Sequence, residues 1–368
     1  MFCVSRRIDK KLPSGSIQET FFREEKLDKN LLISKETGLP RFGYFNEIIN
    51  KINCEDFKYK SPLGKQKGKL AKKIDFKEFQ FIGLLSEDLI LGCAIADIKY
   101  ASNAFIYFYD PKNKDFEEFS FLNPFAIKTK LSSCPHEGKS YFYKGKNSIE
   151  IIPAGPLKRL LIVQLKNGQK VQLTLTENKG SSPLRVCTRT GATGWTYTEK
   201  SNGLSVSGTV YWKGVTRKIE GDKYAANVDI SMGYMRRETY WNWASFSGFV
   251  DIGSVKEKIG LNLASGVNET SYSENCFWVG QKKIHLNGAC FSFDRENPRS
   301  RWFIKTQDNS IDLEFVPDEE RSEKINLFFL ASNFKQMIGK FYGVIKDGEQ
   351  EININGLWGF TEDHFAKW

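Results

Sequence analysis

The sequence contains no apolar run long enough to cross a lipid bilayer as a helix. Its longest uninterrupted apolar stretches, such as LILGCAIA at residues 89–96, fall far short of the roughly 20 residues that a membrane-spanning helix needs. The opening residues, MFCVSRRIDKKLPSG, are basic, but no apolar stretch follows them as it would in a secretory signal. These absences indicate a cytoplasmic protein with no transmembrane segment.

Cysteine and histidine are few and dispersed. The seven cysteines include no CxxC pair, and no two cysteine or histidine residues stand at the spacing of zinc ligands. An odd, scattered set of cysteines is typical of reduced thiols in the cytoplasm. The sequence also lacks a phosphate-binding loop, a G-x-G-x-x-G turn and a G-x-S-x-G elbow. We therefore expect no metal, no cofactor and no hydrolase triad.

Capped amphipathic helices are also scarce, whereas aromatic residues are abundant, with 29 phenylalanines. Aromatic enrichment favours strands over helices. Hairpin signals recur from Phe79 onward, and the clearest are two strand-like runs around Asn167-Gly168 and a second pair around Asp347-Gly348. Short helical turns are expected only near residues 43–52 and 319–325. The pattern predicts an all-β chain.

Similar segments occur twice in the same order along the chain. For example, residues 81–98 resemble residues 246–266. The repetition indicates a duplicated β-domain with its seam near residues 225–234, although generic hairpins could also match by chance. Each copy has strand signals for a barrel of about eight strands. The predicted organisation is an N-terminal arm at residues 1–78, a first antiparallel β-barrel at 79–230 and a second at 231–368, with few short helices.

The positive charge is concentrated near the N-terminus. The net charge is +10, and residues 1–80 contain 18 Lys or Arg against 11 Asp or Glu, which contributes +7. Most of this excess lies between Lys58 and Lys73, which hold seven lysines and no acidic residue. Pro62, Gly64 and Gly68 punctuate the stretch, so it is predicted to be a solvated loop. Because no nucleic-acid reading motif is present, we expect no nucleic-acid partner. Contact with an anionic surface through these lysines is the alternative.

A short segment, RRETYWNWASFSG at residues 236–248, places two of the eight tryptophans two positions apart. In a strand, alternate side chains share one face. That face carries Thr239, Trp241, Trp243, Ser245 and Ser247. Two indoles beside hydroxyl groups suit an apolar cavity with a few polar anchors. We predict that they line the inside of a β-barrel; the alternative is that the indoles simply fill its core.

Acidic side chains that could drive chemistry occur in three places. Glu274 precedes an apolar strand in SENCFW, and Asn262 could face it across the barrel mouth. The others are Arg237-Glu238 and the carboxylates beside a histidine in TEDHFAKW. A carboxyl group in an aromatic pocket has a raised pKa and can protonate an alkene or carbonyl. Glu274 is therefore the candidate acid, and the alternative is a structural carboxylate bonded to backbone amides.

The C-terminal candidates are Glu362, Asp363 and His364. They could belong to the site. Alternatively, this end of the chain is a latch in which Trp368 packs and Glu362 pairs with a nearby base, and we favour the latch.

Three segments, GYMRRETYWNWASFSG, IGLNLASGVNETSYSENCFWVGQKKIHL and GLWGFTEDHFAKW, resemble in order and spacing the uncharacterised bacterial family catalogued as domain of unknown function 2804. The segment FQFIGLLSEDLILGCAIADI is similar to its N-terminal half, so the resemblance covers nearly all of the chain after about residue 35. That family in turn resembles the two-domain, lipocalin-like group that contains carotenoid 1,2-hydratases, AttH-like proteins, tocopherol cyclases and certain fungal Diels–Alderases.

The resemblance implies two lipocalin-like barrels side by side, with an apolar pocket at or near their junction and a polyene or isoprenoid type of substrate. Residues 240–243, Tyr-Trp-Asn-Trp, stand where the hydratases carry an Asp-His-Glu-Trp-type motif, so the protonating groups of those enzymes do not transfer to this chain.

The combined expectation is a hydrophobic small molecule, lipid- or isoprenoid-derived, that is isomerised, cyclised or hydrated with Glu274 as the acid. A non-catalytic carrier or sensor with the same pocket is the alternative. The predicted ligand-binding residues are Arg237, Thr239, Trp241, Trp243, Ser245, Asn262 and Asn275.

Overall fold

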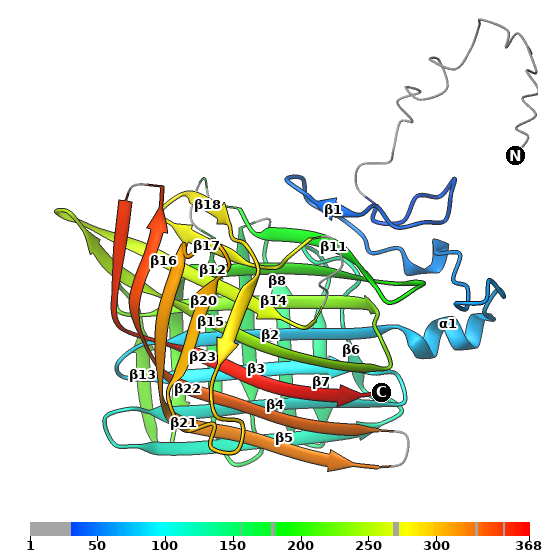
Figure 1. Ribbon diagram of the computed structural model, residues 1–368. Coiled ribbons are helices and arrows are strands. Elements are labelled where there is room, and N and C mark those ends of the chain that lie inside the picture. Colours follow the sequence, from blue (N-terminus) through cyan, green and yellow to red (C-terminus); the bar gives the residue numbers. More distant parts are fainter. Residues whose placement is uncertain are drawn as a thin grey trace, which may run out of the picture.

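The computed structural model describes residues 31–155, 157–177, 180, 182–267, 272–327, 330–348 and 350–368. The opening residues considered above as a possible signal lie outside this part of the chain. Strands dominate the described residues, with one α-helix, α1 (Lys69–Asp75), and one short 3-10 helix, η1 (Cys54–Asp56). The predicted all-β class is confirmed, and the strands form two curled antiparallel sheets (Figure 1).

The first sheet curls into a nearly closed barrel with the strand order β5-β4-β3-β2-β14-β12-β10-β9-β8-β7-β6. Strands β11 and β13 pair with the long strand β12, and β1 pairs with β11. The bounds are β1 (Gly43–Tyr44), β2 (Lys77–Leu85), β3 (Ile90–Asp97), β4 (Ala101–Asp110), β5 (Asp115–Pro124), β6 (Thr129–Lys130), β7 (Ser140–Lys144), β8 (Asn147–Pro153), β9 (Lys158–Gln164), β10 (Lys170–Thr176), β11 (Leu184–Thr190), β12 (Gly194–Trp212), β13 (Val215–Ile219) and β14 (Ala225–Tyr234).

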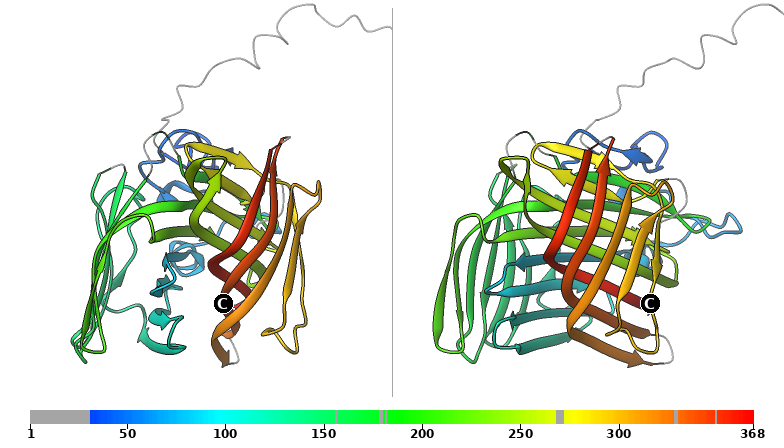
Figure 2. Two further views of the ribbon diagram at one scale, coloured as in Figure 1. Left: turned by 90° about the vertical axis from the view of Figure 1, so that its left-hand side faces the viewer. Right: turned by 60° about the vertical axis from the view of Figure 1, so that its left-hand side comes forward.

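The second sheet forms a half-barrel with the order β18-β17-β16-β15-β23-β22-β21-β20-β19. Figure 2 shows its red and orange strands beside the cyan and green strands of the first sheet. The bounds are β15 (Glu238–Ile252), β16 (Val255–Ser265), β17 (Cys276–Val279), β18 (Lys282–His285), β19 (Ala289–Ser292), β20 (Trp302–Thr306), β21 (Ile311–Asn326), β22 (Ala331–Asp347) and β23 (Gln350–Lys367).

The two sheets share one layout. In each, the first long strand pairs with the last one, β2 with β14 and β15 with β23, and the following strands add outward in order. This agrees with the repeated order of segments in the sequence. The predicted seam at residues 225–234 is β14 itself, which belongs to the first sheet, so the connection to the second sheet lies after Tyr234. The division into domains with a boundary after residue 230 stays a prediction.

The helical turns predicted from local sequence are absent from the predicted positions. Residues 319–325, predicted as a helical turn, lie within β21 and pair along β22, and residues 43–52 contain β1 and no helix. The single α-helix instead forms at the end of the lysine-rich stretch that was predicted to be a loop. Long-range pairing with a neighbouring strand overrides the weak local preference of a charged segment.

The interior of the first barrel is filled with side chains. Its core includes Trp195, Tyr197 and Phe142, all fully buried, and the arm before β2 adds Ile49 and Phe57 to it. The concave side of the second sheet has its own core, and a separate apolar cluster lies between the sheets. The barrel interior is therefore packed, and space for a ligand has to be found elsewhere.

The sheets approach most closely where β12 crosses β16. A Cβ atom added at Gly260 would lie 2.5 Å from the Cβ of Asn202 and 2.6 Å from its carbonyl carbon. Gly203, the next residue, has φ +72°, a left-handed conformation that favours glycine. The amide of Asn202 uses this contact to donate to the carbonyl oxygen of Leu261 at 2.5 Å. Two glycines thus allow backbone-to-backbone contact between the sheets.

Replacing Gly260 with alanine should destabilise the protein by about 1–3 kcal/mol, because the added methyl group would push the sheets apart. Chemical denaturation followed by tryptophan fluorescence measures this loss. Gly68→Ala is the matched control, since a Cβ there meets nothing within 4 Å, and it should change stability by less than about 0.5 kcal/mol. Equal effects of the two substitutions would contradict the tight crossing.

Candidate functional site

A cavity of about 240 Å³ lies between the two sheets. The first sheet contributes β2, β3, β4, β5 and the outer faces of β12 and β14, and the second contributes β15, β16, β21, β22 and β23. Its apolar wall is largely aromatic, with Phe79, Phe81, Phe105, Trp241, Trp243 and Phe334. Such a wall, with a few polar groups among the rings, is typical of a pocket for an apolar small molecule.

The tryptophan-bearing face of β15 is turned toward the first sheet. Trp243 packs in the cluster between the sheets, whereas Ala244 and Phe246 belong to the interior of the second sheet. The predicted alternation is therefore confirmed, but the prediction that this face lines the inside of a barrel is wrong. Both faces of β15 are buried, so the alternation alone does not tell which face points to the strand's own barrel.

Glu362 is the acidic group that the cavity wall holds in the most apolar surroundings. It lies opposite Trp243 across the β15–β23 ladder. Its Oε2 accepts a hydrogen bond from Trp241 Nε1 at 3.0 Å, and its Oε1 accepts one from Gln336 Nε2 at 2.7 Å. Burial raises the pKa of Glu362 to about 7, although both hydrogen bonds favour the charged form and partly oppose this. A carboxyl group with this pKa can donate a proton near neutral pH.

Gln336 is itself held in place from the first sheet. Tyr107 on β4 donates its hydroxyl proton to Gln336 Oε1 at 2.6 Å. Since an amide whose oxygen is occupied must offer its NH₂ group on the other side, this contact orients Gln336 toward Glu362. The acid therefore depends on both sheets for its position.

His364 follows Glu362 on the same face of β23. Its ring lies 4.1 Å from that of Trp241, measured between ring centres. Burial and then the charge of Arg321 lower its pKa to about 3, so the imidazole is neutral at physiological pH. Nε2 lies 3.0 Å from the hydroxyl of Ser332, and Nδ1 has no hydrogen-bond partner within the part of the chain that the structure describes. A buried nitrogen of this kind is available to a ligand or to water.

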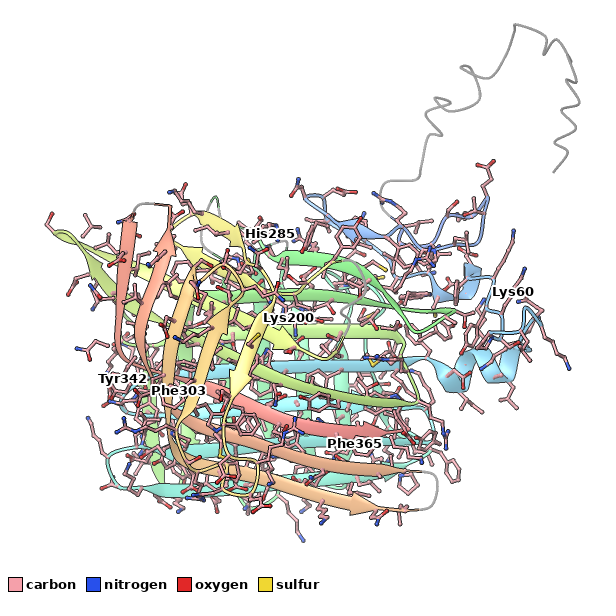
Figure 3. The ribbon with its side chains drawn as sticks, in the orientation of Figure 1. Lys60, Lys200, His285, Phe303, Tyr342 and Phe365 are labelled. Carbon is pink, nitrogen blue, oxygen red and sulfur yellow. The ribbon has the colours of Figure 1, made fainter. Side chains whose placement is uncertain are left out.

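A buried group of three charges forms the far wall. Lys200 on β12 forms an ion pair with Asp229, its neighbour across the ladder to β14, and a second one with Glu274 at 3.0 Å. All three line the cavity, and both Lys200 and Glu274 are 5% exposed at the side chain. Burial raises the pKa of Asp229, against the effect of Lys200. Figure 3 shows Lys200 near the centre of the molecule.

The structure places a charged partner beside Glu274. Glu274 forms an ion pair with the ammonium group of Lys200 at 3.0 Å, and its role as the acid stays a prediction. Glu362, which was grouped with a possible latch, occupies the position suited to an acid. The predicted pairing of Glu362 with a base is wrong, because its side chain bonds to Trp241 and Gln336. Trp368 does pack as expected, with its Nε1 donating to Arg236 O at 3.1 Å.

The remaining predicted residues that lie at or near the cavity have three different positions. Thr239 lines the cavity. Asn262 and Asn275 brace the wall from behind: Asn262 Oδ1 accepts a bond from Trp243 Nε1 at 2.8 Å, and Asn275 Oδ1 accepts one from Ala264 N at 2.7 Å. Ser245 lies in the contact between the sheets, where Asn202 Nδ2 donates to its hydroxyl at 2.7 Å.

Two predicted residues lie outside the cavity wall. Arg237 is exposed, and its guanidinium donates to Trp368 O at 3.4 Å. Asp363 points to the opposite face of β23 and accepts a bond from Asn242 Nδ2 at 3.0 Å.

Sequence reasoning missed Lys200, Asp229 and Arg321. Arg321 lies on β21 with its guanidinium 3.7 Å from the ring centre of Phe105 and pairs with Glu118 at 2.9 Å. A signal was present, because Asp229 is a lone carboxylate within the apolar strand AANVDISMGY. A charge at such a position is rarely buried without a partner.

No helix in the described residues is long and apolar enough to span a membrane. A sequence search found no match among curated proteins. Residues 23–368 match the family described as "Domain of unknown function (DUF2804)". The chain belongs to this family, as its sequence motifs indicated.

Several solved structures have a similar fold. An AttH-like protein from Nitrosomonas europaea has a TM-score of 0.50 at 9% identity, over 78% of this chain and 92% of that one. CghA with bound Sch210972 has a TM-score of 0.49 at 8% identity, over 78% and 88% of the two chains. Kievitone hydratase from Nectria haematococca has a TM-score of 0.44 at 11% identity, over 79% and 88%. At these identities the likeness concerns the fold alone, and the lipocalin-like, two-sheet architecture agrees with the AttH-like structure.

Proposed function

We propose that the protein binds an apolar small molecule in the cavity between its sheets and acts on it as a cofactor-independent isomerase, cyclase or hydratase. In this proposal Glu362 is the acid. The single observation that carries the proposal is a carboxyl group with a pKa raised to about 7 in a pocket walled by aromatic rings. A carboxyl group in such surroundings is protonated over a useful fraction of molecules at neutral pH, so it can act as a general acid.

The proposed reaction begins with transfer of the Glu362 proton to an alkene carbon or carbonyl oxygen of the ligand. The π faces of Trp241 and Trp243 stabilise the cation that forms. The Glu362 carboxylate then removes a proton from a neighbouring carbon, which yields an isomer or, after ring closure, a cyclised product. If water adds to the cation instead, it gives up one proton to Glu362 and the product is an alcohol. Each route regenerates the acid; isomerisation and cyclisation need no further reactant, and hydration consumes one molecule of water.

The surrounding groups support specific parts of this scheme. The two donors to Glu362, Trp241 and Gln336, stabilise the carboxylate that forms after proton transfer. His364 is neutral and its Nδ1 has no partner among the described residues, so it suits a polar group of the ligand. The aromatic wall holds the ligand in one conformation, and exclusion of water by this wall would favour isomerisation or cyclisation over hydration.

Comparing small molecules bound to the wild type and to Glu362→Gln tests this proposal. Both proteins are produced in the same host, and native mass spectrometry identifies what each retains. We expect the variant to keep a compound that purified wild-type protein converts to an isomer or to its hydrate. Conversion by the variant should be slower by about 10²- to 10⁴-fold.

Asp363→Asn is the matched control, because it removes a carboxylate from the next residue on the opposite face of β23. It should convert the compound at the wild-type rate. If the wild type and Glu362→Gln retain the same compound and neither alters it, the protein is a carrier and the catalytic proposal fails.

A further inference from the structure

One end of the strands carries an unusual set of exposed apolar side chains. Helix α1, the start of β2, the turn after β5 and the end of β23 lie together at this end, on the right in Figure 1. The cavity reaches the same end, because its wall includes the first residues of β2, β4 and β22, Lys77, Ala101 and Ala331.

Helix α1 buries none of its residues. Leu70 and Ile74 are four positions apart, which places them on the same side of the helix, and they are 70% and 38% exposed. Leu63, in the turn just before the helix, is 97% exposed. A helix of seven residues is marginal in water unless its apolar side packs against something. The side that carries Leu70 and Ile74 therefore lacks its packing partner within the described residues.

The turn after β5 presents two more apolar side chains in a strained backbone. Phe125, Ala126 and Lys128 have φ of 56°, 51° and 59°, in the left-handed region that residues other than glycine rarely adopt. The turn holds Phe125 at 76% exposure and Ile127 at 59%. Such strain persists only where the surrounding structure imposes it, and it is concentrated at functional segments.

Hydrogen bonds connect both segments to the cavity wall. Lys77 Nζ donates to Ile74 O at 2.8 Å and to Ile98 O at 3.0 Å, and Ile98 lines the cavity. Phe125 N donates to Tyr100 O at 2.8 Å, while the Tyr100 ring lies 4.7 Å from Lys77 Nζ. Helix, strained turn and cavity wall thus form one continuous surface.

The charge around this surface has one sign. Lys60, Lys65, Lys69 and Lys73 are exposed, and none forms an ion pair within the described residues. The chain from Lys58 to Ile74 contains no acidic residue. Figure 3 shows Lys60 at the outer edge of the molecule. Lysines beside exposed leucine, isoleucine and phenylalanine side chains match a surface that is anionic and has an apolar layer behind it.

We propose that this docking face, defined as Leu63, Leu70, Ile74, Phe125 and Ile127 with the four lysines, binds the surface of an anionic phospholipid bilayer. The apolar side chains enter the headgroup layer and the lysines contact lipid phosphates. A nucleic acid would use the lysines and leave the exposed apolar side chains without a role, so the bilayer is the better match. Docking places the cavity against the lipid, from which an apolar ligand can enter without crossing water.

This inference goes beyond the proposed function, because docking requires neither ligand nor turnover. Its test is co-sedimentation of the full chain with vesicles of phosphatidylcholine containing phosphatidylserine, over a range of sodium chloride concentrations. We expect binding that weakens with added salt and is at least about tenfold weaker on pure phosphatidylcholine. Glu362→Gln should bind these vesicles as the wild type does, which separates docking from catalysis.

The double variant Leu70→Asp/Phe125→Asp should bind the anionic vesicles at least about tenfold more weakly. Val215→Asp/Val255→Asp is its matched control, with the same change of charge at side chains that are 52% and 54% exposed and begin β13 and β16, at the other end of the strands. It should lose much less. Equal losses in the two double variants, no vesicle binding by the wild type, or binding of RNA but not vesicles would each overturn the proposal.

Discussion

Lys200→Met should destabilise the protein by about 3–5 kcal/mol at neutral pH. The substitution keeps the length of the side chain but removes the ammonium group that forms ion pairs with both Asp229 and Glu274. Both buried carboxylates would then lose their ion pair with Lys200, and removing one partner of a buried ion pair is strongly destabilising. Denaturant unfolding curves at neutral and mildly acidic pH measure the loss. It should shrink as the pH falls, because the stranded carboxylates take up protons.

Two further variants make this result specific. The triple variant Lys200→Met/Asp229→Asn/Glu274→Gln has no buried charge at this position and should recover most of the lost stability. Lys223→Met removes an ion pair with Asp88 whose lysine is 61% exposed and should cost less than about 1 kcal/mol. A triple variant as unstable as the single one would mean that the lysine acts through packing and not through its charge.

Glu362→Gln should change the way stability depends on pH. The pKa of Glu362 is about 7 in the folded protein and 4.5 for the ordinary group. Below pH 4.5 the wild-type carboxyl is protonated in both states. Between pH 4.5 and 7 the unfolded state releases this proton first, so the stability of the wild type falls as the pH rises, and above pH 7 the loss is complete. The difference of 2.5 pKa units corresponds to about 3 kcal/mol.

The glutamine side chain of the variant does not titrate, so the variant does not lose stability in this way. Its free energy of unfolding relative to the wild type should therefore rise by about 2.5 kcal/mol between pH 5 and pH 8. Asp363→Asn should show no such rise. A constant difference between the glutamine variant and the wild type over this interval would show that Glu362 is already ionised at pH 5. The proposed acid would then be excluded, whatever ligand the cavity holds.

The sequence showed which side chains share one face of a strand, but it did not show which other strand that face packs against. Alternation in β15 correctly grouped Trp241 with Trp243, because the period of a strand is a local property. Which sheet this face packs against depends on contacts with residues far away in the sequence. Trp243, for example, contacts Phe81 on β2. The repeated hairpins similarly indicated an all-β chain, whereas helix α1 and the strand at residues 319–325 were not predicted.

The candidate acid illustrates the same limit. Glu362 was visible in the sequence as one of several carboxylates, but its pKa depends on burial by β4, β15 and β22 together. Tyr107 reaches Gln336 across 229 positions of the chain. Lys200 and Asp229 meet through the ladder between β12 and β14, a register that no local pattern specifies. Glu274 was the candidate acid because it precedes an apolar strand, and the lysine that pairs with it lies on the other sheet.

Because the interior of the first barrel is packed, the cavity lies outside the cores of both sheets. The shape of the cavity depends on the angle and separation at which the two sheets meet. Gly203 and Gly260 lie at the closest contact between these sheets. Side chains on the facing surfaces can change size or polarity while each core keeps its own packing. The cavity wall can consequently change at little risk to folding, and a shift at the glycine pair would alter the whole cavity at once.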